Sequence, residues 1–175
     1  MKATRKAVII TGKLVQDHEF IYPYYRLLEE GFAVDIAVRG KEPTQGQIGV
    51  KIIPTKDIPE LRVSDYDVLV IPGGAKCMEY LRQDKEIIKF IADFHASGRV
   101  ISSICHAAQM LISAKLVKGK RISGYYSIKD DIENAGATYV DEPAVIDDRI
   151  VTTAHYKDLG PWMKATIKEV ARVIG

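Results

Sequence analysis

The chain has 175 residues, of which 47% are hydrophobic, and it carries a formal net charge of +2 at pH 7; we expect a single domain spanning residues 1–175 with a substantial core. Basic and acidic residues are interspersed and the apolar runs are far shorter than a membrane span or a signal-peptide core, so we expect no nucleic-acid partner and no membrane partner. Two cysteines make no disulfide framework, which favours a reduced, cytoplasmic protein.

From residue 6 to residue 74 the sequence alternates between buried strands and a helix. The continuous apolar run KAVIIT at 6–11 predicts a strand that is buried on both faces. Apolar spacing at 18–30 predicts a helix that Gly31 caps and that Pro23 either kinks or begins. The next segments predict a second strand, a short edge strand and a third buried strand, at 33–38, 50–54 and 66–74.

The alternation continues to the end of the chain. Helices are expected at 79–95, 106–116, 127–136 and 162–173. Strands are expected at 99–104, 138–140, 144–146 and 149–154. Because buried strands alternate with helices, the sequence predicts an α/β fold, a doubly wound parallel sheet covered by helices on both sides.

Cys105 lies where the strand at 99–104 passes directly into a helix. A side chain at such a turn projects into the crevice at the carboxyl ends of the strands, where ligands bind in this class of fold. A helix N-terminus also favours a thiolate and lowers the pKa of the thiol. A cysteine that only fills space is the alternative, and the position favours a reactive one.

Two further features are expected at the same edge of the sheet. Gly73 and Gly74 allow close backbone approach, so their N–H groups suit an oxyanion hole that faces the sulfur, unless they form only a turn. Glu19 begins a helix, where capping is its simplest role. An ionised Glu19 would oppose a thiolate, whereas a protonated Glu19 would donate a hydrogen bond to it or act as general acid and base.

Two histidines compete for the role of base. His106 directly follows Cys105, and because neighbouring residues of a helix do not face each other, it serves the thiol only if the turn bends the chain. His155 follows the last strand and is the alternative. None of these residues has metal-site spacing, so we expect no metal and no cofactor. Cys77, the second cysteine, is expected to pack at an interface, with a second redox-active thiol as the alternative.

Several stretches together resemble one known family. They are VIPGG, SICHAAQMLISAKLVKGKRIS, SIKDDIENAGATYVDEPAVID and DHEFIYPYYRLLEEGFAV, and they span nearly the whole chain. They are similar to the PfpI family, the intracellular-protease-like branch of the superfamily that includes the Parkinson-linked protein deglycase. The resemblance implies a flavodoxin-like three-layer sandwich of the class I glutamine amidotransferase type. It also implies Cys105 as nucleophile and Glu19 as the carboxylate hydrogen-bonded to it.

The resemblance further implies a catalytic site completed by self-association. His106 would be the partner of Cys105, and in PfpI-like assemblies an acidic residue of the neighbouring subunit completes a Cys-His-Glu arrangement. The matching position here is Glu79, so a dimer or a hexamer would form part of the site. The matching oxyanion and pocket positions are Gly74, Ala75, His106 and Tyr125. Ala107 and Ala108 stand where the family usually has Gly-Pro, which changes the pocket wall.

Three functions remain open at this point. In the first, Cys105 adds to a small reactive carbonyl such as methylglyoxal while Glu19 and His106 move protons, which is glyoxalase or deglycase chemistry without glutathione. In the second, Cys105, His106 and Glu79 hydrolyse a peptide or a small amide. In the third, a non-enzymatic redox sensor or stress chaperone, Cys105 is oxidised to sulfinic acid beside Glu19. The sequence favours the first.

Overall fold

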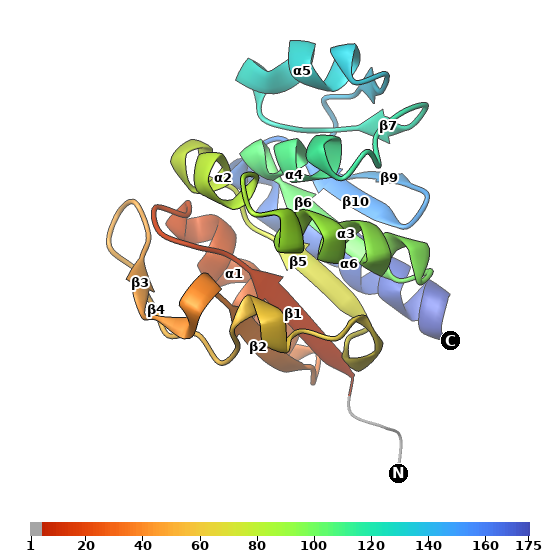
Figure 1. The fold of residues 1–175 in the computed structure, drawn as a ribbon. Coiled ribbons are helices and arrows are strands. Elements are labelled where there is room, and N and C mark those ends of the chain that lie inside the picture. Colours follow the sequence, from red (N-terminus) through yellow and green to blue (C-terminus); the bar gives the residue numbers. More distant parts are fainter. Residues whose placement is uncertain (1–4) are drawn as a thin grey trace.

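A six-stranded sheet forms the centre of the computed structural model, which describes residues 5–175 (Figure 1). The strands are β1 (Lys6–Ile10), β2 (Ala33–Ala37), β5 (Val68–Ile71), β6 (Val100–Ile104), β9 (Val145–Asp147) and β10 (Ile150–Thr153). They lie in the order β2-β1-β5-β6-β10-β9. The pairs are parallel except for β9, which runs antiparallel to β10 at the edge. The mostly parallel, doubly wound sheet is therefore confirmed.

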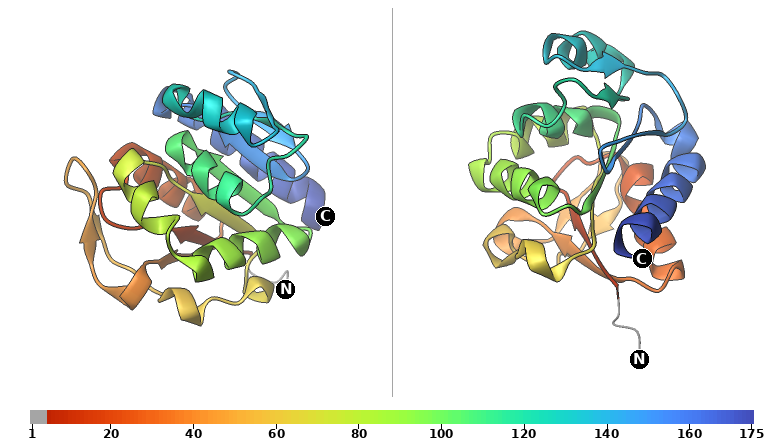
Figure 2. Two further views of the ribbon diagram at one scale, coloured as in Figure 1. Left: turned by 45° about the horizontal axis from the view of Figure 1, so that its top comes forward. Right: turned by 90° about the vertical axis from the view of Figure 1, so that its right-hand side faces the viewer.

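Helices cover both faces of this sheet, as the three-layer prediction requires (Figures 1 and 2). One face carries α1 (Asp17–Glu29) and α6 (Leu159–Ile174). The other carries α2 (Ala75–Leu81), α3 (Lys85–Ala96) and α4 (Ala108–Ser113). The helix α5 (Lys129–Asn134) lies beyond α4 with a two-stranded sheet of β7 (Arg121–Ile122) and β8 (Thr138–Tyr139). Short 3₁₀ turns lie at Arg39–Lys41, Ile58–Glu60, Val63–Asp65, Cys105–Ala107, Tyr126–Ile128 and Tyr156–Asp158.

The core lies on both sides of the central strands. Every residue of β5 and β6 is buried, which explains why their sequences are continuous apolar or small-residue runs rather than alternating ones. Phe94 of α3 packs into one face and Trp162 of α6 into the other, and both side chains are fully buried. Burial of an aromatic side chain of this size contributes about 2–3 kcal/mol to folding. Within residues 5–175, none of the helices has the length and apolar character needed to cross a membrane.

Several predicted elements differ from the structure in extent or pairing, among them the helix at 79–95. The single helix expected at 79–95 is two helices, because Asp84 caps α3 by accepting hydrogen bonds from the N–H groups of Glu86 and Ile87. Arg39 binds the same carboxylate at 2.7 Å and holds the break in place.

The edge strand expected at 50–54 does not join the central sheet. Its residues form β4 (Lys51–Ile52), which pairs antiparallel with β3 (Thr44–Gln45) in a separate hairpin. Asp17 at the start of α1 holds this hairpin by accepting the N–H groups of Ile48 at 2.8 Å and Val50 at 2.6 Å. The buried carboxylate thus satisfies backbone groups that a sheet neighbour would otherwise satisfy.

The strand order reverses between β1 and β5. From β1 the chain moves to β2 on one side, and β5 and β6 then follow on the other side. Crevices in doubly wound sheets open at the carboxyl ends of strands at such a switch point. The segments that follow β1, β5 and β6 therefore meet at one edge of the sheet, and these segments carry Glu19, Gly73 and Cys105.

Candidate active site

Cys105 occupies a strained turn between β6 and α4. Its φ of 62° lies in the left-handed region, which non-glycine residues seldom adopt. A 3₁₀ turn at Cys105–Ala107 follows, so the helix expected over 106–116 starts later and is shorter. Because the chain bends at Cys105, Nδ1 of His106 comes within 3.3 Å of its Sγ. The bend overcomes the difficulty that consecutive helical residues point apart.

Glu19 lies beneath the thiol and is completely buried. Its Oε2 accepts a hydrogen bond from the N–H of Gly73 at 2.8 Å. Its Oε1 has no hydrogen-bond partner of ordinary geometry among the described residues, and the Cys105 thiol is the side chain that interacts with this carboxyl. A Cβ atom at Gly73 would lie 2.6 Å from Oε2 of Glu19 and 2.8 Å from Cβ of Cys105, so the three groups meet only because this residue is glycine.

Burial determines the protonation of both acidic groups. It raises the pKa of Glu19 to about 7, although the hydrogen bonds from Cys105 and Gly73 act in the opposite direction. Burial, and next the charge of Glu19, raise the pKa of the Cys105 thiol, so the lowering expected from the helix N-terminus does not dominate. At neutral pH the pair therefore holds at most one negative charge, and the raised pKa of the thiol leaves that charge to Glu19.

Backbone N–H groups face the sulfur from two sides. Those of His106 and Gly74 both act to lower the pKa of Cys105. Gly74 has a φ of 103°, and a Cβ there would lie 2.8 Å from the backbone oxygen of Leu14. This donor pair has the arrangement of an oxyanion hole, and Ala75 begins α2 beside it.

These groups line one cavity of about 350 Å³. Its lining comprises Gln16, Glu19, Gln47, Gly74, Ala75, Cys105, His106, Tyr125, His155 and Tyr156. The positions predicted from sequence as nucleophile, carboxyl, oxyanion donors and pocket aromatics are thus brought together, apart from Glu79 and Gly73. Gly73 lies immediately behind them, and it is not an oxyanion donor as expected, because its N–H donates to Oε2 of Glu19.

His155 forms part of the aromatic wall. Its Nδ1 accepts the N–H of Lys157 at 3.1 Å, and its ring packs against Tyr156 with centroids 4.0 Å apart. Tyr125 stacks between this ring, at 6.0 Å, and that of His106, at 4.7 Å. Of the two competing histidines, His106 is therefore the one whose ring contacts the sulfur.

Glu79 and Cys77 lie apart from the cavity. Glu79 is exposed on α2 and forms an ion pair with Lys76 at 2.6 Å. Cys77 is completely buried within the chain, where burial raises the pKa of its thiol to about 12. The expectation that Cys77 packs at an interface is wrong, because its sulfur faces Thr11 and Gly12 in the core; its redox activity stays a prediction.

Sequence reasoning missed several residues of the site. Gln47 is carried to the cavity by the β3–β4 hairpin, and Gln16 caps α1 beside it. Ser127 places its Oγ 3.3 Å from Nε2 of His106. Proximity to the predicted Tyr125 was the only sequence signal for Ser127.

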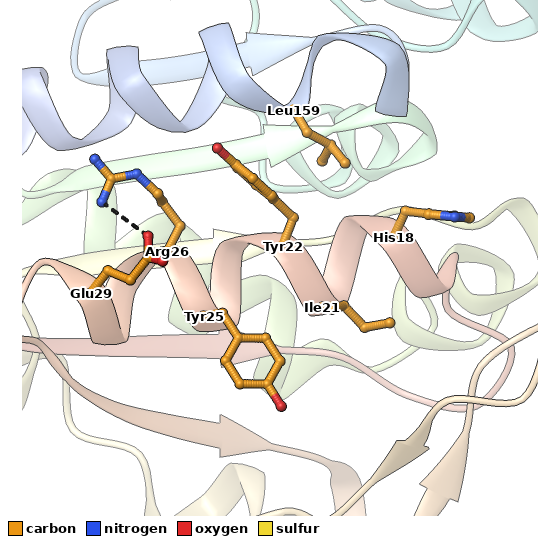
Figure 3. Close-up of a pocket in the computed structure, with 7 residues that line it drawn as sticks. All are labelled: His18, Ile21, Tyr22, Tyr25, Arg26, Glu29 and Leu159. Atoms are coloured by element: carbon orange, nitrogen blue, oxygen red, sulfur yellow. Dashed lines mark ion pairs between the residues drawn. The ribbon is translucent and has the colours of Figure 1, made fainter.

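A second hollow lies between α1 and α6 and has a different character (Figure 3). Its volume is about 330 Å³. It is lined by His18, Ile21, Tyr22, Tyr25, Arg26, Glu29 and Leu159. It contains an ion pair of Arg26 with Glu29 at 3.8 Å, and neither cysteine is among its lining residues.

The fold and the strained cysteine define a flavodoxin-like α/β protein with a cysteine-centred pocket at the switch point of its sheet. The chain belongs to the DJ-1/PfpI family, whose pattern matches residues 5–169. Deglycase PfpI from Pyrococcus furiosus is 34% identical over 163 residues, which are 93% of this chain and 98% of that protein. Protein/nucleic acid deglycase 2 from Escherichia coli is 33% identical over 172 residues, which are 97% of this chain and 96% of that protein.

A solved structure shows the same fold. The crystal structure of Drosophila melanogaster DJ-1beta matches with a TM-score of 0.87 at 23% identity, over 98% of this chain and 96% of that one. This likeness concerns the arrangement of helices and strands. The flavodoxin-like prediction and the predicted family are both confirmed.

Proposed function

We propose that this protein is a cysteine-dependent enzyme that acts on reactive carbonyl compounds, with glyoxalase or deglycase chemistry that needs no glutathione. The observation that carries the proposal is the pairing of the strained Cys105 with a buried Glu19 whose pKa is about 7. A carboxyl with such a pKa both donates and accepts protons near neutral pH. Relatives named deglycase, at 33% and 34% identity over nearly the whole chain, support it.

In the first step the Cys105 thiol gives its proton to Nδ1 of His106 or to Glu19, and the sulfur adds to the aldehyde carbon of an α-oxoaldehyde. The new C–S bond forms as the carbonyl π electrons move to oxygen, which takes up a proton to give a hemithioacetal. The N–H groups of Gly74 and His106 stabilise the developing oxyanion. With an amine adduct, the C–S bond replaces a C–N bond and the amine leaves with a proton.

A proton shuttle completes the reaction. The hydrogen of the former aldehyde carbon leaves as a proton, and a proton is returned to the neighbouring carbonyl carbon, so one carbon is oxidised as the other is reduced. Glu19 and His106 are positioned for these transfers, because both contact the sulfur that holds the substrate. Water then hydrolyses the resulting thioester, which releases a 2-hydroxy acid and restores the thiol.

The test is lactate formation from methylglyoxal in the absence of glutathione. The wild type should form lactate, whereas Cys105→Ser should form none and Glu19→Gln should lose at least about a hundredfold in kcat. Cys77→Ala is the matched control, since it removes the buried thiol of the core and should retain activity. Failure of the wild type to convert methylglyoxal and its amine adducts, with facile sulfinic-acid formation at Cys105, would leave the sensor as the explanation.

Peptide or small-amide hydrolysis by a self-associated form is the second candidate. It is supported by the contact of His106 with Cys105 and by the exposure of Glu79, which leaves that carboxylate accessible to a neighbouring copy. Hydrolysis of fluorogenic peptides that is lost in both Cys105→Ser and Glu79→Gln, with assembly intact by light scattering, would establish it. If Glu79→Gln changes neither activity nor assembly, no intersubunit Cys-His-Glu arrangement operates. We place the activity in the cytoplasm, where the free thiols of Cys77 and Cys105 stay reduced.

A further inference from the structure

The turn that follows β7 brings a hydroxyl group to the far side of His106. Ser127 Oγ lies 3.3 Å from Nε2 of His106, while Nδ1 of the same ring lies 3.3 Å from Sγ of Cys105. The imidazole thus bridges the thiol and a serine of its own chain. Neither the sequence motifs nor the proposed mechanism gives this serine a role.

The turn that carries Ser127 is anchored to the nucleophile itself. The N–H of Tyr125 donates to the backbone oxygen of Cys105 at 3.1 Å. Gly124 accepts the Tyr139 hydroxyl at 3.1 Å, and a Cβ at Gly124 would lie 2.9 Å from that of Ala108 in the first turn of α4. With its backbone attached at these points, the turn holds Ser127 at a defined distance from the His106 ring.

The plane of the imidazole is also restrained. The ring of Tyr125 stacks on it with centroids 4.7 Å apart and an interplanar angle of 26°. Stacking blocks rotation out of the plane, so the two ring nitrogens keep their separate partners. Ser127 is solvent-exposed, and its hydroxyl makes no hydrogen bond to another described residue.

We propose that Ser127 is the positioning residue of His106, a hydroxyl that holds Nε2 as either donor or acceptor while Nδ1 exchanges a proton with Cys105. This proposal rests on the proposed carbonyl chemistry and deepens it. When the thiol donates to Nδ1, Nε2–H donates to the serine oxygen. When Nδ1–H donates to the thiolate, the serine O–H donates to Nε2. The proton lost between these two states passes from Nε2 to Ser127 Oγ, and the serine proton goes to water at this exposed side chain.

A hydroxyl differs here from the carboxylate that usually orients a catalytic histidine. A carboxylate only accepts, so it keeps the proton on Nε2 and stabilises the imidazolium ion. A hydroxyl serves both tautomers and adds no charge. His106 therefore relays the proton as a neutral imidazole, in agreement with burial lowering its pKa.

The charged and titratable groups around His106 allow this relay. The groups that share its cavity are Cys105 in the strained turn after β6, Glu19 from α1, Tyr125 from the turn that carries Ser127, and His155 and Tyr156 across the cavity. On α2, which packs against the Cys105–Ala107 turn, Lys76 and Glu79 are paired with each other. None of the described lining residues is a lysine or an arginine, so a charge placed at Ser127 would act directly on the imidazole.

The first test measures the tautomer and needs no substrate. The ¹⁵N chemical shifts of His106 should move between the wild type and Ser127→Ala, which removes the partner of Nε2, and should return in Ser127→Thr, which restores the hydroxyl. Thermal unfolding of each variant controls for the fold. If the shifts of both ring nitrogens are the same in Ser127→Ala as in the wild type, the proposal is wrong.

The second test measures proton transfer. Ser127→Ala should lower kcat about three- to tenfold with KM unchanged within about twofold, and Ser127→Thr should restore it. Ser127→Asp should move the acid limb of the pH profile of kcat/KM to higher pH, whereas the neutral isostere Ser127→Asn should leave it in place. If the acid limb of the kcat/KM profile lies at the same pH in Ser127→Asp and Ser127→Asn, the proposal is wrong. An inactive wild type would instead reject the proposed function, and the ¹⁵N experiment would then decide the role of Ser127 alone.

Discussion

Nδ1 of His106 lies 3.3 Å from Sγ of Cys105, although the two residues are consecutive in the chain. The left-handed backbone at Cys105, with a φ of 62°, turns the thiol and the imidazole toward the same cavity. A regular helix would direct them about 100° apart around its axis. Backbone strain at one residue thus brings the thiol together with the imidazole that we propose as its base.

The strain at Cys105 predicts a difference between two variants that both remove the thiol. Cys105→Gly should be more stable than Cys105→Ala by about 1 kcal/mol, because glycine adopts a positive φ without the steric cost of a Cβ. Urea unfolding of the two proteins gives this difference. Equal stabilities, or a more stable alanine variant, would show that the turn is unstrained.

Burial of Glu19 predicts that stability falls as pH rises. The pKa of this carboxyl is about 7 in the folded chain and near 4.5 when solvated, so between these values the folded state holds a proton that the unfolded state has lost. The free energy of unfolding is therefore not reduced by Glu19 below about pH 4.5. As the pH rises to 7 or 8, the burial of this carboxyl lowers the free energy of unfolding by up to about 3 kcal/mol.

Glu19→Gln should remove this pH dependence because the amide does not titrate. The measurement is the free energy of unfolding at pH 5 and at pH 8 in the wild type and the variant. Glu133→Gln, which changes an exposed carboxyl on α5, is the matched control and should keep the wild-type slope. The same slope in Glu19→Gln as in the wild type would contradict the prediction.

Gly73 predicts a second contrast, this time between two glycine substitutions. Gly73→Ala should cost about 1–3 kcal/mol and abolish the reaction, because its Cβ would lie 2.6 Å from Oε2 of Glu19 and 2.7 Å from the backbone oxygen of Ile104. Gly160→Ala introduces the same methyl group where nothing lies within 4 Å and should be neutral or slightly stabilising in α6. Thermal unfolding and lactate formation compare the two, and comparable activity in both would be inconsistent with close packing at Gly73.

The hydrogen bonds of Asp17 to the hairpin that carries Gln47 lead to a prediction about the stability of that hairpin. Asp17→Asn replaces a charged acceptor of two N–H groups with an amide, so the amide protons of Ile48 and Val50 should exchange with solvent at least about tenfold faster. We also expect a higher KM, since Gln47 lines the cavity. Asp130→Asn, on the exposed side of α5, is the control. Unchanged exchange at Ile48 and Val50 would mean that the hairpin is held by its other contacts.

The tertiary structure separated helices and strands that periodicity alone could not resolve. Residues 79–95 have apolar residues on both sides of a polar run at 82–86, where Asp84 caps the second helix and Arg39 binds its carboxylate from a distant loop. Residues 50–54 have the composition of an edge strand, and the choice between the sheet and a hairpin depends on the carboxylate of Asp17. The hairpin rests on contacts between residues far apart in sequence, whereas the helix break combines a local cap with the distant Arg39.

The sequence by itself determined the layered α/β fold and the position of Cys105 at the end of a buried strand, since apolar runs that alternate with helices have to be buried in a parallel sheet and Cys105 follows one of them. It also pointed to Glu19 and Gly73, because both follow strands that end at the same edge. Only the tertiary structure decided which histidine meets the thiol, that Glu19 is buried enough to hold a proton near pH 7, and that Ser127 reaches His106. Those properties depend on a backbone angle, on exclusion of water and on distances across the fold, and local residue pattern does not specify any of them.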